Sequence, residues 1–308
     1  MMPNENMTLP LDILYQNDDV MVIQTHTGVS DKADQLTGHD DNQLALYGKF
    51  NMALHVNDVP SWVLNRRARL LAWLYEQAGA NQIHWLNQVH GNVVIDVDQP
   101  RSQSLSLADA LITQRAKTAL AIMTADCVPI AIFEKNGGAV ACIHAGWQGL
   151  TNGVIAKTVA LMPTSSKLFA VIGACISLPA YEVDQHLAEH IIDEVVTNKL
   201  VLLDRQVLFD MLIKPSNNRG KAYLDIKSLA RLQLEKFGIT VVPSANAHQS
   251  LRNRQNGDAY HQKITADMML FYRNIWVMYD EFGAKHLVKN VSHAGLSISI
   301  NATSMPNC

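Results

Sequence analysis

Three short apolar runs in the centre of the chain constrain its fold more than any other feature. Residues 118–133 (TALAIMTADCVPIAIF) contain two of these runs, separated by TADC and a proline, and residues 138–144 (GAVACIH) contain the third. Continuous apolar runs of this length are typical of buried strands, and the first should end near Thr124. The sequence therefore predicts three buried strands in this region.

Helical patterns lie on both sides of these strands along the chain. A helical period runs from Leu150 to Met162 after the two glycines of AGWQG, and another covers residues 61–78. From Tyr181 to Leu200 apolar residues recur every four positions, which predicts a surface helix docked by one face. Because strands and helices do not alternate strictly, we expect an α+β fold in which mixed β-sheets are flanked by helices.

The length of the chain allows one large domain or two ordinary ones. It has 308 residues, 48% of them apolar, which is enough to bury a full core. The polar stretches at 31–43, 99–106 and 214–221 are short for linkers between domains. We therefore expect residues 1–308 to form a single domain.

Composition disfavours several classes of function. Lys and Arg number 25 against 28 Asp and Glu, with no run of five like charges, so we expect no nucleic-acid partner. The N-terminus shows no signal peptide, and no run of about 18 apolar residues suggests a membrane span. Four cysteines in a chain of this size are no disulfide framework. We expect a soluble, cytoplasmic, globular protein.

Reactive side chains stand beside small residues in three segments at predicted strand ends. These side chains are His90 in NQVHG, Cys127 in TADC and His144 in IHAGW. Two imidazoles and a thiol match the ligand preferences of zinc, and three protein ligands with an open fourth position are typical of catalytic sites. Because the three residues are far apart in sequence, a buried structural cysteine with ordinary histidines remains the alternative.

The same side chains are compatible with a cysteine hydrolase. Cys127 would be the nucleophile and His144 the base, with Asp126 or Gln88 nearby. Copper suits the chain less well than zinc, because no H-x-H pair is present and sequence does not place Met123 as an axial ligand.

Two further patterns carry weaker functional interpretations. His186 and His190 match the H-x-x-E-H pattern of inverted zinc peptidases, but they flank the apolar stripe of a predicted helix, and two surface histidines are the preferred reading. Arg66 and Arg67 could hold an anion, although such a pair more often forms a solvated helix face.

Taken together, NQVHG, MTADCVPI and HAGWQGL resemble the bacterial laccase-domain family in order and approximate spacing. Members of that family were formerly described as multicopper polyphenol oxidases and are now described as zinc-dependent purine nucleoside phosphorylases. The similarity covers about residues 20–240 and leaves residues 244–308 atypical. It extends to ADALIT at 108–113, to AYEVD at 180–184 and to a set of matching polar residues, Asn51, Asp58, Asn65 and Arg66.

The resemblance implies a fold, a cofactor and an activity. The fold would be a sandwich like that of laccase-domain proteins and cysteine hydrolases, with zinc held by His90, Cys127 and His144. The activity would be phosphorolysis of adenosine and inosine, with 5'-methylthioadenosine as another substrate and adenosine deamination in addition. The small-molecule partners would then be a purine nucleoside and phosphate. Asp126, beside the thiolate ligand, is the nearest candidate for proton transfer, and a turn residue at the strand end is the alternative.

Other interpretations of the resemblance stay open. Some family members are described as peptidoglycan-editing enzymes, which agrees with a hydrolase that uses Cys127 and His144. A degenerate protein that binds zinc without turnover is the third interpretation.

Several positions depart from the family pattern. Gln148 stands where HAGWRGL has an arginine, and residues 25–30 lack the arginine of T-R-x-G-G-V-S. In the C-terminal region, Tyr272-Arg273 and Ile275-Trp276 support two incompatible alignments. Since arginine is the preferred bidentate partner of phosphate, these losses predict altered specificity or reduced activity.

Overall fold

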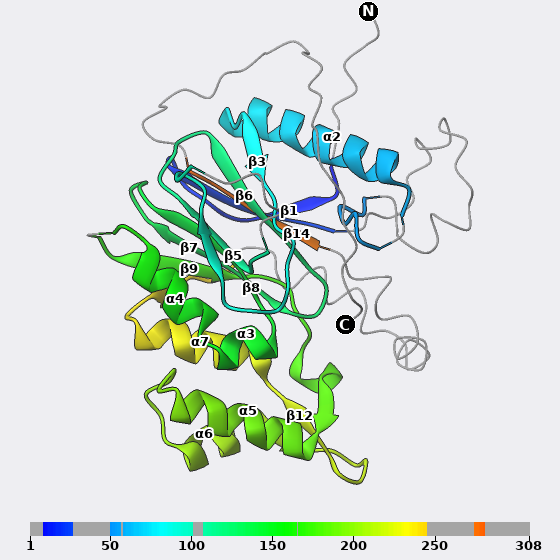
Figure 1. Ribbon diagram of the computed structural model, residues 1–308, viewed down its shortest axis with the longest axis vertical. Coiled ribbons are helices and arrows are strands. Elements are labelled where there is room, and N and C mark those ends of the chain that lie inside the picture. The colour runs from blue at the N-terminus through cyan, green and yellow to red at the C-terminus, as the bar shows by residue number, and fades with distance from the viewer. Residues whose placement is uncertain are drawn as a thin grey trace, which may run out of the picture.

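Two β-sheets packed face to face form the centre of the fold, and helices cover both outer faces (Figure 1). The computed structural model describes residues 9–26, 50–56, 58–100, 107–164 and 166–244, together with the backbone of 274–280. Within these ranges, no helix has both the length and the apolar character that crossing a bilayer requires.

Each sheet combines parallel and antiparallel strand pairs. In the first sheet the spatial order is β1 (Leu11–Gln16), β2 (Val20–Thr25), β14 (Asn274–Asp280), β6 (Thr118–Thr124) and β3 (Gln82–His84). In the second sheet the order is β13 (Thr240–Val241), β9 (Leu168–Ile172), β7 (Val128–Glu134), β8 (Val140–Ala145), β5 (Ala110–Thr113) and β4 (Val94–Asp96). These are the mixed sheets that the sequence predicts.

Strand β6 shows why the two sheets stack. Leu120 and Ile122 lie in the core between the sheets with Phe133 of the second sheet, whereas Ala119 and Ala121 pack beneath helix α2 (Pro60–Ala78). Side chains alternate between the two faces of a strand, so an apolar run buries both faces only when each is covered. The expected buried strands, the sandwich and the helix over residues 61–78 are therefore confirmed.

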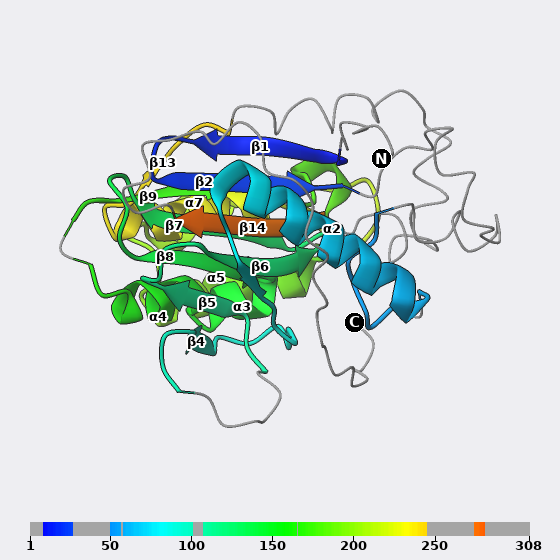
Figure 2. The same cartoon turned by 90° about the horizontal axis from the view of Figure 1, so that it is seen from above.

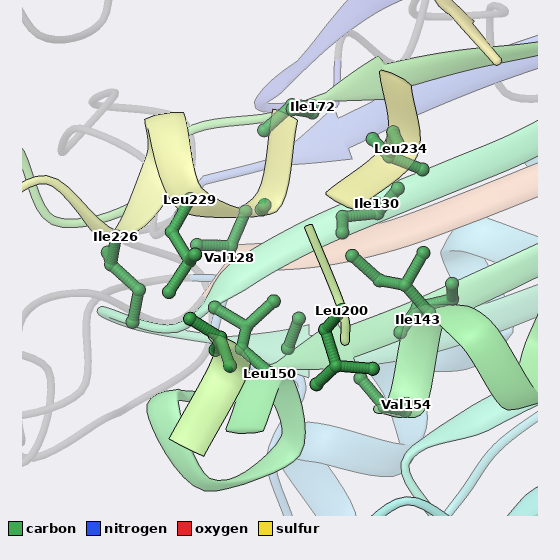
Figure 3. Close-up of a cluster of buried hydrophobic side chains, with 14 of the residues drawn as sticks. Val128, Ile130, Ile143, Leu150, Val154, Ile172, Leu200, Ile226, Leu229 and Leu234 are labelled. Atoms are coloured by element: carbon green, nitrogen blue, oxygen red, sulfur yellow. The ribbon is translucent and has the colours of Figure 1, made fainter. Parts of the chain in front are cut away.

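Helices also cover the outer face of the second sheet. Ile130 and Ile143 on that face pack with Leu150, Val154 and Leu229 from the helical layer (Figure 3). This layer contains α3 (Trp147–Thr151), α4 (Val154–Leu161), α5 (Gln185–Thr197), α6 (Arg205–Leu212) and α7 (Ile226–Lys236). It also includes the turn η2 (Leu178–Ala180) and a small sheet of β10 (Glu182–Asp184), β12 (Lys221–Leu224) and β11 (Ile213–Pro215).

Two predicted helices differ from the structure. The helix expected over residues 150–162 is divided into α3 and α4 by Gly153, whose φ of 76° is left-handed and breaks the regular helix. The helix expected from Tyr181 begins at Gln185, because Glu182–Asp184 pair with β12 in an antiparallel ladder. The helical period continues through such a short strand, so periodicity alone did not show this boundary.

The region beyond residue 244 supplies an interior strand of the first sheet. Strand β14 lies between β2 and β6, pairing with both of them antiparallel (Figure 2). Ile275-Trp276 belong to this strand, whereas Tyr272-Arg273 lie outside the described residues, as do residues 27–49 and 101–106.

Arg66 and Arg67 form neither a solvated helix face nor a free anion site. Both are buried on α2. Arg66 donates to Asp58 at 2.6 Å, and Arg67 donates two hydrogen bonds to the Met52 carbonyl oxygen at 2.9 and 2.7 Å. The two guanidinium groups therefore hold the segment at residues 51–58 against α2, and this corrects the sequence-based expectation.

Replacing Phe133 with alanine should lower the free energy of unfolding by about 3–5 kcal/mol. The Phe133 ring is fully buried between the sheets, with its centroid 4.7 Å from that of Tyr15. Urea titration measures the change, with Phe237→Ala as the control. Because Phe237 is 38% exposed, its loss should cost about 1 kcal/mol or less. Equal costs for both variants would contradict this account of the core.

Candidate metal centre

The structure brings His90, Cys127 and His144 together at one end of the sandwich. Their ligand atoms all lie within 4.8 Å of one another, and within the described part of the chain this is the group that could hold a metal ion. Cys127 lies in the turn between β6 and β7, His144 is the penultimate residue of β8, and His90 lies in the loop between β3 and β4. A turn, a strand end and a loop therefore supply one side chain each.

A fully buried carboxylate, Asp109, connects the side chain of His144 with the backbone of His90. Its Oδ1 lies 2.9 Å from Nδ1 of His144 and accepts a hydrogen bond of 2.9 Å from the His90 backbone N–H. Its Oδ2 accepts from the Gly91 N–H at 2.7 Å. Sequence reasoning missed Asp109, because a carboxylate just before a strand gives no signal of its distant partners. Its place within ADALIT was the available clue.

The loop that carries His90 has an uncommon backbone conformation and is hydrogen-bonded to the end of β6. His90 itself has a φ of 58°, which is uncommon for a residue with a side chain. The amide of Gln88 donates to the Met123 carbonyl oxygen at 2.6 Å and accepts from the Met123 N–H at 2.7 Å. The sequence suggests Gln88 as a neighbour of a Cys127 nucleophile. In the structure its side chain attaches the loop to the end of β6.

Gly146 leaves space between the ligands. A Cβ atom at this position would lie 3.0 Å from the Cys127 sulfur and 3.2 Å from Cδ2 of His90. Such distances are shorter than ordinary van der Waals contacts. The absence of a side chain at residue 146 is therefore needed to keep the two groups at this separation.

The surroundings of the centre shift the pKa values of Cys127 and His144 in opposite directions. Burial alone would raise the pKa of Cys127, but hydrogen bonds and charge from His144 and His90 outweigh it and lower the pKa to about 6. Burial opposes protonation of His144, whereas Asp109 and Cys127 favour it and raise the pKa to about 9. The electrostatics therefore favour a thiolate at residue 127, which is the form that binds metals.

Two further polar groups lie close to the thiolate. Asp126 is partly buried, and this burial raises the pKa of its carboxyl group. Burial, followed by the charges of Cys127 and Asp126, raises the pKa of Tyr181 to about 12, so its hydroxyl stays protonated at neutral pH. Sequence reasoning did not select Tyr181, although AYEVD belongs to the quoted similarity.

Comparison with known protein families identifies the family of this chain. The family described as multi-copper polyphenol oxidoreductase laccase matches residues 35–255, which is most of the chain. The chain belongs to this laccase family.

Several relatives of this laccase-family chain carry a functional name. A purine nucleoside phosphorylase of Mycobacterium bovis is 36% identical over 149 residues, which are 47% of this chain and 59% of that protein. One of Pseudomonas aeruginosa is 32% identical over 199 residues, covering 64% of this chain and 74% of the relative. The chain thus spans little more than half the length of the first of these relatives.

Solved structures share the laccase-family fold. A crystal structure of a Neisseria meningitidis protein matches with a TM-score of 0.63 and 24% identity, covering 88% of this chain and 99% of the other. The structure of YlmD from Geobacillus stearothermophilus matches with a TM-score of 0.60 and 22% identity, covering 88% of this chain and all of the other. At these identities the comparison supports the fold alone.

The other residues that the sequence singles out lie outside the ligand cluster. His186 and His190 are exposed on α5, which agrees with two surface histidines. The Met123 sulfur lies 3.7 Å from Nη2 of Arg67, on the side of β6 that faces α2.

Gln148, in place of the family's arginine, is exposed on α3. Of the other polar residues that match the family, Asn51 donates a hydrogen bond to Asp58 at 2.9 Å, and Asn65 is exposed to solvent.

Proposed function

We propose that this chain is a zinc-dependent purine nucleoside phosphorylase that takes adenosine or inosine and phosphate as substrates. The observation that carries the proposal is the convergence of His90, Cys127 and His144 on one point beside Gly146. The type of reaction is taken from the names of the relatives, and the ligand cluster is the site at which we place it.

The donor set fits zinc better than copper chemistry of the multicopper type. Two imidazoles and a thiolate are the nitrogen and sulfur ligands that tetrahedral zinc prefers. Within the described residues there is one such cluster, which suits a single ion. When bound to His90, Cys127 and His144, zinc would supply a Lewis acid.

We assign Asp126 to proton transfer in this reaction. In phosphorolysis a phosphate oxygen forms a bond to the anomeric carbon of the ribose while the bond from that carbon to the purine nitrogen breaks. The electron pair of the broken bond stays on the purine, which needs a proton as it leaves. Asp126 precedes the cysteine of the cluster, and a partly buried carboxyl group there is suited to give that proton. The protonated Tyr181 hydroxyl, which is influenced by the charges of Cys127 and Asp126, adds a hydrogen-bond donor.

Purine release by the purified protein, measured with and without phosphate, tests the proposal. We expect free purine and ribose 1-phosphate in equal amounts only when phosphate is present, about one zinc per chain, and loss of turnover after chelation. Purine release that does not depend on phosphate, or that survives removal of the metal, would contradict it. Inosine formed from adenosine without phosphate would show the additional deaminase activity.

One observation favours a second function. His144 lies between Cys127, with which it forms a hydrogen bond, and Asp109, which is the order of a cysteine–histidine–carboxylate triad. A cysteine hydrolase acting on an amide, such as a peptidoglycan precursor, would use this arrangement. It would keep its activity after chelation, and an electrophile such as iodoacetamide would label Cys127 and stop turnover. Stoichiometric zinc without turnover of either substrate class would instead indicate a binding protein.

A further inference from the structure

We propose that Asp109 is the positioning residue of the centre, fixing two of the three metal ligands at once through hydrogen bonds to one carboxylate. This inference rests on the proposed metal site, and it assigns a role to a residue that would not touch the ion. Asp109 directs the imidazole of His144 by a side-chain hydrogen bond and the backbone of His90 by main-chain hydrogen bonds.

The His144 contact determines which ring nitrogen is available to a metal. A carboxylate can only accept, so Nδ1 of His144 must carry the hydrogen in the 2.9 Å contact with Asp109. Nε2 is then the nitrogen on the side of Cys127, and its lone pair can bind an ion once the proton that it shares with the thiolate has left. Histidines that bind metals commonly donate their second N–H to a carboxylate in this way, which fixes both the tautomer and the ring orientation.

The His90 contacts hold a backbone conformation that the residue would rarely adopt alone. Left-handed φ values cost free energy for a residue with a Cβ atom. Asp109 compensates by accepting from three successive backbone N–H groups, those of Val89 at 3.2 Å, His90 at 2.9 Å and Gly91 at 2.7 Å. Because the carboxylate is fully buried, water cannot replace it as the acceptor for these groups.

An asparagine at position 109 cannot satisfy both sets of donors. If its carbonyl oxygen faces His144 and the His90 N–H, its NH₂ group meets the Gly91 N–H at about the present 2.7 Å, donor against donor. If the amide is turned over, the NH₂ group faces Nδ1 of His144, which must then accept, and the hydrogen moves to Nε2. The first orientation disturbs the loop of His90, and the second blocks the metal-binding nitrogen of His144.

Metal binding by Asp109→Asn tests the proposal without any assay of turnover. We expect the variant to fold and its zinc affinity to fall by roughly 10–100-fold. The cobalt-loaded variant should show altered visible bands, because the ligand geometry changes. Asp98→Asn is the matched control, since Asp98 accepts from Thr113 and from the Gln114 N–H at the opposite end of β5. It should bind zinc like the unsubstituted chain.

The tautomer of His144 gives a second readout if the variant does not fold. In the zinc-loaded unsubstituted chain, ¹⁵N NMR of the histidine rings should show hydrogen on Nδ1 of His144 and none on Nε2. Hydrogen on Nε2, or an Asp109→Asn variant with unchanged affinity and cobalt spectrum, would overturn the inference while leaving the metal site in place. An unsubstituted chain that binds no zinc would overturn the proposed function itself.

Discussion

Replacing Cys127 with alanine should abolish both metal content and turnover. The thiolate is the anionic ligand of the three, and its loss leaves two imidazoles. If one ligand contributes about a quarter to a third of the 10–16 kcal/mol typical of structural zinc, affinity falls by roughly a hundredfold or more. Elemental analysis of the dialysed protein measures the metal, and purine release in the presence of phosphate measures turnover.

A second buried cysteine provides the control for this substitution. Cys142 lies fully buried between the two sheets, and its burial raises the pKa of its thiol. Cys142→Ala should keep its zinc and its activity, with a modest loss of stability from the smaller core side chain. Cys127→Ala that retained one zinc per chain would remove the thiolate from the proposed ligand set. Metal lost from both variants would point to a general loss of structure.

Gly146→Val should remove metal binding by filling the space between the ligands. The first atom of any side chain at residue 146 would already lie 3.0 Å from the Cys127 sulfur, and a branched side chain adds two methyl groups beyond it. The backbone does not oppose the change, since Gly146 has a φ of −73° and a ψ of 170°, which any residue adopts. We therefore expect the metal to be lost, as in Cys127→Ala, with far less loss of stability than of zinc affinity.

Zinc affinity and thermal unfolding of the same preparations test this expectation. Gly146→Ala should show a smaller loss than Gly146→Val, because its single methyl group needs only a few tenths of an ångström of adjustment. Gln148→Ala, at an exposed position of the same short helix, should bind zinc normally. Normal zinc affinity in Gly146→Val would show that the ligands approach the ion from a different side.

Local patterns in the sequence were sufficient for the parts of the fold that local forces determine. The strands β6, β7 and β8 and the helix α2 follow from apolar runs and periodicity, which report burial directly. The three cluster residues could be nominated because reactive side chains beside glycine or other small residues near predicted strand ends are visible in the sequence.

Other features depend on contacts between distant segments and could not be predicted. The role of Asp109 arises because β5 lies beside β8, which brings its carboxylate to His144, 35 residues further along the chain. Helix α5 starts later than its periodicity predicts because β10 pairs with β12, about 40 positions further along the chain. None of these partners leaves a trace in the neighbouring residues.

The position of β14 has a consequence for how the chain acquires its structure on the ribosome. Strands β2 and β6 are made early, yet neither pairs with the other, since β14 separates them. At about 5–20 residues per second, the interval between synthesis of β6 and of β14 is on the order of ten seconds. During that time both strands present open edges that invite pairing with other nascent chains. Substitutions in residues 274–280 should therefore increase aggregation and the need for chaperones more than the sequence of that segment alone suggests.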